Sequence, residues 1–107
     1  MRKLIMILSL IGLLSFSNKN EIIGNATYYN TKPHPKVHRK HSTAAYYKGS
    51  RGQFYVITNL SNNRVDTVEI TDCNGTHPGK IDLKEETFHK LTGNLKIGKI
   101  PVKITKI

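Results

Sequence analysis

Asp72 occupies the position in this sequence that is best suited to chemistry. It ends the strand-like run 65–71 and opens the Gly- and Pro-rich loop 74–79. Regular alternation along the run puts Asp72 in phase with Val68 and Ile70, so its carboxylate is expected to point toward an apolar interior. Such surroundings raise the pKa of a carboxyl group toward the range of a general acid or base. The alternative is that Asp72 accepts backbone N–H bonds in its own turn.

Two further titratable residues follow Asp72 closely in the chain. Asp82 is the candidate for a second carboxylate, although its place just before a predicted helix also suits a helix cap. His77 lies in the intervening loop and is either an ordinary loop residue or a proton-transfer partner of Asp72. The sequence therefore offers one prominent acid and two residues with open roles.

Three histidines, His34, His38 and His41, lie in the segment 30–41 and raise the possibility of a metal site. Lysines and an arginine surround them, and the sequence has no acidic residue from position 30 to position 63. A divalent cation would gain no local charge compensation there. We therefore predict no metal and no cofactor, and we expect this segment to be a basic loop that contacts an anionic substrate.

The elements that must position these residues are short strands and one helix. The segment 42–47 contains two alanines and is expected to form one or two helical turns. The segment 84–91 has apolar residues at helical spacing and Gly93 as a stop signal, so it predicts a helix. The turn 61–64 suits a tight hairpin because asparagine tolerates positive φ. Alternating or β-branched runs predict strands at 22–29, 53–60, 65–71, 81–83 and 100–107. Five or six short strands around one helix favour a compact β-barrel.

The N-terminal segment is typical of a signal peptide. Arg2 and Lys3 precede an apolar run from Leu4 to Phe16, which is short for a membrane span. We expect residues 1–17 to be a signal peptide, 18–23 a linker and 24–107 a single domain. The alternative is an uncleaved anchor. Cys73 is the only cysteine and does not follow the apolar run, so neither a lipoprotein nor an internal disulfide is expected.

The chain is strongly basic, which restricts its partners. Seventeen Lys and Arg residues against seven Asp and Glu give a formal net charge of +10 over 107 residues, and loss of the leader would lower this by two. An exported basic domain is expected to meet anionic envelope polymers or acidic glycans. No nucleic-acid-binding motif is present, and the basic residues are scattered among strands, so nucleic acid is not an expected partner.

Several stretches of the sequence, taken together, resemble the rare lipoprotein A family. These are GNATYYN at 24–30, STAAYY at 42–47, VITNLSNNR at 56–64, VEITDCNG at 68–75 and KIDLKEETFHKL at 80–91. The most specific parts are the T-N-L-x-N-x-R turn and the spacing from T-D to I-D-L. The similarity covers about 24–107. It implies a six-stranded double-psi β-barrel related to the first domain of expansins and to barwin-like endoglucanases.

The resemblance implies a lytic transglycosylase. Such an enzyme cleaves the peptidoglycan glycan strand between N-acetylmuramic acid and N-acetylglucosamine without water and leaves a 1,6-anhydro end. The family position of the catalytic aspartate corresponds to Asp72, which would serve as the single general acid and base. A transglycosylase needs no second carboxylate because the muramic 6-hydroxyl attacks, whereas a hydrolase normally uses two.

The expected substrate-binding residues surround this aspartate. Tyrosines can stack on sugar rings, and the loop and the following strand supply polar groups. The set is Tyr28, Tyr29, Tyr46, Asn74, His77 and Asp82, although Tyr46 stands where the family usually has a histidine. The expected location is the periplasm, cell envelope or exterior, as a monomer. The alternative functions are a non-catalytic, expansin-like module that binds or loosens wall glycan, and an effector that uses the barrel as a scaffold.

Overall fold

The computed structural model describes residues 20–30 and 41–107. The predicted signal peptide and most of the histidine-containing segment lie outside these residues. The elements are β1 (Glu21–Tyr29), β2 (Thr43–Tyr46), β3 (Phe54–Asn59), β4 (Val65–Cys73), β5 (Lys80–Lys84), α2 (Glu85–Thr92), the 3-10 helix η2 (Leu95–Ile97) and β6 (Ile100–Lys106). No helix in the described part of the chain has the length and apolar character to cross a membrane.

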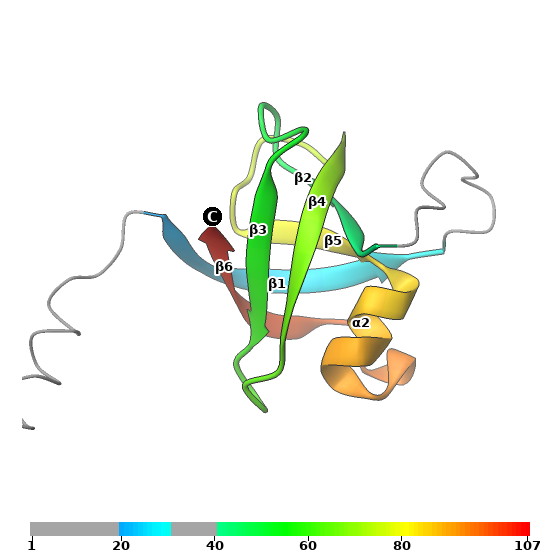
Figure 1. Cartoon of the computed structure of the whole chain (residues 1–107). Helices are drawn as coiled ribbons and strands as arrows, with labels where there is room; N and C mark the ends of the chain where they lie inside the picture. The colour runs from blue at the N-terminus through cyan, green and yellow to red at the C-terminus, as the bar shows by residue number, and fades with distance from the viewer. Residues whose placement is uncertain (1–19, 31–40) are drawn as a thin grey trace, which may run out of the picture.

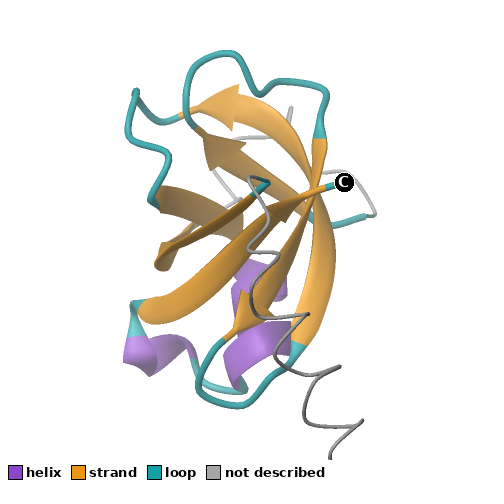
Figure 2. Cartoon of the chain, turned by 90° about the vertical axis from the view of Figure 1, so that its left-hand side faces the viewer, coloured by secondary structure: helices purple, strands orange, loops and turns teal. Residues whose placement is uncertain are grey.

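The six strands close into one barrel in the order β1-β5-β2-β4-β3-β6 (Figures 1 and 2). Two of the pairings, β1 with β5 and β2 with β4, are parallel, and the other four are antiparallel. The predicted six-stranded, mainly β barrel is therefore confirmed. β1 begins at Glu21, so the barrel includes residues 21–23, which the sequence analysis assigned to a linker.

The core fills the barrel with one face of each strand. Ile57 of β3, Val68 and Ile70 of β4, and Val102 and Ile104 of β6 are almost fully buried at alternate positions. This is the period of two expected when one face of each strand points inward. The other alternate positions face outward, and they are the ones that can form a surface site.

The segment 42–47 is where the predicted secondary structure is wrong. It forms the strand β2 instead of helical turns, and all four of its residues are buried. β2 lies between β4 and β5 and pairs with both. Pairing on two edges and complete burial outweigh the weak helical preference of Ala44 and Ala45.

The helix α2 is confirmed, and the β3–β4 turn caps its C-terminus. Asn63 has φ of 62°, as predicted for the hairpin. The side-chain amides of Asn59 and Asn62 donate to the Leu91 carbonyl at 2.9 and 3.0 Å, and Arg64 donates to the Lys90 carbonyl. These carbonyls have no partner within the helix. The Asn-rich turn therefore serves the helix as well as the hairpin.

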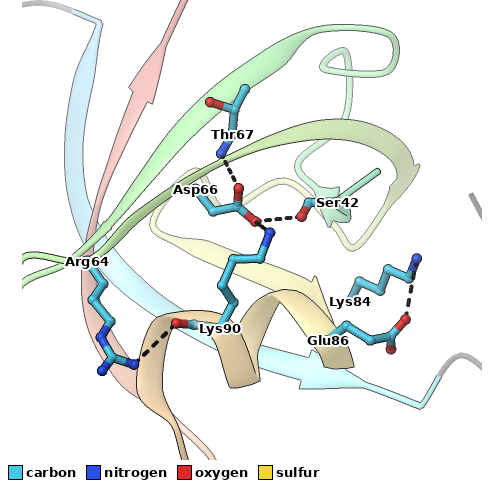
Figure 3. Close-up of polar contacts among 7 residues, drawn as sticks. All are labelled: Ser42, Arg64, Asp66, Thr67, Lys84, Glu86 and Lys90. Carbon is cyan, nitrogen blue, oxygen red and sulfur yellow. Dashed lines mark hydrogen bonds and ion pairs between the residues drawn. The ribbon is translucent and has the colours of Figure 1, made fainter. Parts of the chain in front are cut away.

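Asp66 ties the same helix to the barrel wall (Figure 3). Its carboxylate accepts from the Ser42 hydroxyl at 2.5 Å and lies 3.3 Å from the Lys90 ammonium. It also accepts from the Thr67 N–H. Because Ser42 immediately precedes β2, this one carboxylate connects the start of β2, strand β4 and α2.

Candidate functional site

A lateral row of outward-facing residues crosses four neighbouring strands. Thr27 on β1 pairs with Asp82 on β5, Asp82 pairs with Ala45 on β2, and Ala45 pairs with Asp72 on β4. Residues paired across strands project to the same face of a sheet. The sequence neighbours of these residues, such as Ala26 and Leu83, point into the core. The barrel thus displays two carboxylates on its outer face, separated by one small residue and about 10 Å apart at the backbone.

Asp82 is the carboxylate whose properties fit acid chemistry. It is half-buried, and its Oδ1 accepts a 2.8 Å hydrogen bond from the Thr27 hydroxyl. Burial raises the pKa of Asp82 above its ordinary value, and the Thr27 hydrogen bond opposes part of that change. The alternative role as a helix cap is wrong, because Lys84 holds the N-cap position of α2 without a side-chain capping bond.

Asp72 lies on the outside of the barrel, not toward its interior as predicted. Ala44 pairs with Ile70 while Ala45 pairs with Asp72, so the register between β2 and β4 shifts by one residue at Thr71. That irregularity reverses the alternation and carries the Asp72 side chain, which is 62% exposed, to the outer face.

Asp72 contacts one cation and one backbone N–H. Its Oδ1 lies 3.4 Å from an Arg51 guanidinium nitrogen and accepts a 2.8 Å bond from the Cys73 N–H. The backbone contact is the turn-forming role that the sequence analysis kept as an alternative. The environment that was expected for Asp72, partial burial with a raised pKa, is instead found at Asp82.

The three tyrosines that were predicted to bind substrate have different surroundings. Tyr46 is fully buried, and its hydroxyl donates to the Pro78 carbonyl, so stacking of this ring on a sugar is excluded. The ring of Tyr28 packs against Phe88 at a centroid distance of 4.8 Å, on the helix side of β1. Only Tyr29 shares the outward phase of Thr27.

Tyr29 lies within electrostatic range of the carboxylate row. Its hydroxyl is 3.2 Å from that of Thr43. Burial is the main reason that the pKa of Tyr29 is raised; the Thr43 hydrogen bond lowers it, and the charges of Asp82 and Asp72 raise it further. Tyr29 is therefore the predicted aromatic residue that lies close to both acids.

The loop 74–79 folds against β1 and is fixed by its own contacts. The Gly79 carbonyl accepts from the Asn25 N–H at 2.9 Å, and a Cβ on Gly24 would lie 2.2 Å from that carbonyl oxygen. The imidazole Nδ1 of His77 accepts from the Gly79 N–H at 3.0 Å. His77 thus has a defined role within the loop, where its ring is held by the Gly79 N–H.

A pocket of about 270 Å³ opens between this loop and the edge of the carboxylate row. It is lined by Asn25, Thr27, Asn74, Lys80, Ile81, Asp82 and Lys99. Two of the predicted residues, Asn74 and Asp82, are among them. The other lining residues were not predicted from the sequence. The alternation of strand residues predicts that Thr27 faces away from the buried Ala26. The parallel pairing of β1 with β5, which brings Thr27 to Asp82, cannot be predicted from the local sequence.

The histidines give no metal centre in the described part of the chain. His34 and His38 lie outside the described residues. His41 pairs with Glu69 at 2.6 Å. Among residues 20–30 and 41–107, no group of three or more His, Cys, Asp or Glu side chains could hold a metal ion.

The sequence matches no protein-family model and no curated protein. Solved structures do resemble the chain. An Asp-to-Asn mutant of Clavibacter michiganensis expansin in complex with cellohexaose aligns over 81% of this chain and 50% of its own, with 22% identity and a TM-score of 0.61. The apo form of that expansin has 20% identity and a TM-score of 0.59. Cerato-platanin 3 from M. perniciosa aligns over 80% of this chain and 94% of its own, with 14% identity and a TM-score of 0.64.

These similarities establish the fold as a double-psi β-barrel shared with expansins and cerato-platanins. The fold that the resemblance to the rare lipoprotein A family implied is thereby confirmed. The chain spans about half the length of the expansin structures. At a sequence identity of 22% or less, the activity of these proteins cannot be assigned to this chain, so its function must be argued from its own site.

Proposed function

We propose that this protein is an exported barrel that binds glycan strands of a cell wall along the outward row of Thr27, Asp82, Ala45 and Asp72. The observation that carries this proposal is the row itself, in which three of four neighbouring strands supply a hydrogen-bonding side chain in register, with Ala45 between the two acids and Tyr29 beside them. An extended surface of this kind suits a linear polymer better than a small molecule enclosed in a cavity.

Two further observations support the proposal. An expansin barrel of the same fold is solved with cellohexaose, a linear glycan. The net charge of +10 favours an anionic wall over a neutral one, and peptidoglycan strands are the polymer implied by the resemblance to the rare lipoprotein A family. We propose that the protein acts as a monomer in the periplasm, the cell envelope or outside the cell.

The raised pKa of Asp82 favours a second candidate function, lytic cleavage of the bound strand. In this scheme the neutral Asp82 carboxyl donates its proton to the departing glycosidic oxygen as the bond to the anomeric carbon breaks. The muramic 6-hydroxyl oxygen then bonds to that carbon, and its proton passes to a carboxylate. The sequence analysis assigned both proton transfers to Asp72. The contacts favour Asp82 as the donor, and they favour the exposed carboxyl group of Asp72 as one that stabilises positive charge on the sugar.

One experiment tests both functions. The full chain is incubated with peptidoglycan glycan strands freed of stem peptides; sedimentation measures binding, and mass spectrometry detects 1,6-anhydro products. We expect binding by the wild type. If anhydro ends form, Asp82→Asn is expected to abolish them while it retains binding, and Asp72→Asn is expected to reduce them. Glu85→Gln on α2 is the matched control and should change neither readout.

Failure to sediment with any glycan would refute the binding proposal. Binding without anhydro products would refute the lytic function and leave the barrel as a non-catalytic module. Undiminished product formation by Asp82→Asn, with loss in Asp72→Asn, would return the proton transfers to Asp72.

A further inference from the structure

The pocket beside Asp82 contains two basic residues that have no role in the proposed function as stated so far. Two lysines, Lys80 and Lys99, line it together with Asn25 and Asn74. Both lysine side chains are exposed. In the described part of the chain, neither ammonium lies within 4.0 Å of a carboxylate, whereas Lys84, Lys90 and Lys103 each do. The pocket therefore presents two ammonium groups that form no ion pair with a described acid, and it also contains the carboxyl group of Asp82.

The barrel register directs both ammonium groups toward the same corner of the site. Lys80 precedes Asp82 by two residues on β5, so it has the same outward phase and lies about 7 Å along the strand. Lys99 immediately precedes β6. Because Ala26 pairs with Ile100 in an antiparallel register, the next pair in line would join Thr27 and Lys99. The two lysines thus approach the Thr27–Asp82 hydrogen bond from two directions.

We propose that this pocket binds a carboxylate-bearing sugar of the glycan strand, with Lys80 and Lys99 contacting the carboxylate. The inference rests on the proposed function and specifies the chemical class of its substrate. Asn25 and Asn74 supply amide groups for the sugar hydroxyls. The volume of about 270 Å³ is just below the range of about 300–1,000 Å³ that is common for drug-sized ligands, so it suits one sugar unit of a longer strand.

Among the described residues that line this pocket, Asp82 is the one acid. Burial already favours its neutral form. A carboxylate held by the two lysines would favour that neutral form further, because a second negative charge nearby disfavours ionisation. Binding of an acidic sugar would therefore leave Asp82 a better hydrogen-bond donor toward the strand. A neutral glucan would neither contact the two lysines through a carboxylate nor favour the neutral form of Asp82.

The proposal is tested with three soluble probes and titration calorimetry on the full chain at low ionic strength. Peptide-free muramyl strands carry a lactyl carboxylate on alternate sugars, oligogalacturonate carries a uronate on every sugar, and chitohexaose shares the muramyl strand's N-acetylated backbone without the carboxylate. We expect at least tenfold tighter binding of a carboxylated probe than of chitohexaose. Comparison of the two carboxylated probes identifies which acidic sugar is preferred.

Single substitutions locate the effect. Lys80→Gln and Lys99→Gln are each expected to weaken binding of the carboxylated probe about three- to tenfold and to leave chitohexaose unchanged, as for loss of one charge-assisted hydrogen bond. Lys106→Gln is the matched control, because it removes one exposed charge at the far end of β6, about 20 Å from the pocket.

The outcomes separate the two proposals. Equal affinity for carboxylated and neutral probes, or an equal loss in Lys106→Gln, overturns the carboxylate inference while glycan binding stands. Absence of binding to all three probes overturns the proposed function and this inference together.

Discussion

At the scale of single residues, the two aspartates of the row differ in what surrounds them. Asp82 is half-buried beside a hydroxyl, whereas Asp72 is exposed beside a guanidinium. Desolvation raises the pKa of Asp82, whereas Asp72 lies beside the Arg51 guanidinium. Two carboxyl groups with such different surroundings are an arrangement that acid–base chemistry uses.

The raised pKa of Asp82 predicts how stability depends on pH. The folded protein holds this proton more tightly than the unfolded chain, so the Asp82 contribution lowers the free energy of unfolding as pH rises from about its ordinary value of 3.8 through the raised pKa. Asp82→Asn removes that contribution and still accepts from Thr27. We expect the variant to unfold at higher temperature than wild type at pH 7 and at the same temperature near pH 3. Parallel melting curves over this range are the measurement, and identical pH profiles would contradict the prediction.

At the scale of elements, the β3–β4 hairpin and α2 act as one unit. The T-N-L-x-N-x-R motif supplies three side chains to two carbonyls at the end of the helix. Asp66 and Lys90 add an ion pair on the other side of the same junction (Figure 3). The motif is therefore accounted for by the requirements of helix termination, without a role in the site.

This unit predicts a difference between its two asparagines. Asn59 is buried, donates to the Leu91 carbonyl and accepts from the Ser61 N–H. Asn59→Ala is expected to cost about 1–3 kcal/mol, because it leaves buried groups without partners. The exposed Asn62 makes a similar bond in contact with water, so Asn62→Ala should cost less. Urea unfolding of both variants measures the difference, and an equal or reversed order would count against the capping role.

The secondary structure elements also show which features can be predicted from local sequence signals and which cannot. The hairpin, the helix and most strands follow from period-two and period-3.6 patterns and from turn residues. The strand β2 and the outward position of Asp72 do not, because both depend on which strands become neighbours. Thr27 meets Asp82 only through parallel pairing of segments more than 50 residues apart, and no local propensity encodes that pairing.

At the scale of the whole molecule, charge should govern how binding responds to salt. The chain has a formal net charge of +10, and the pocket lysines are exposed. Attraction between exposed charges is screened as the Debye length falls from about 10 Å at 0.1 M to about 3 Å at 1 M salt. We expect sedimentation with peptide-free peptidoglycan strands to fall severalfold over this range and sedimentation with chitin to change little. Salt-independent binding to both polymers would contradict a charge-based preference.

β6 closes the barrel, and this affects the order in which the protein can fold. β6 lies between β1 and β3, and Glu21 pairs with Thr105. Until β6 pairs with them, β1 and β3 each lack a neighbour on one edge, and pairing across such a long stretch of chain is slow. Closure of the barrel is therefore expected to be a late step of folding, and an incompletely folded chain exposes two strand edges that can pair with other chains.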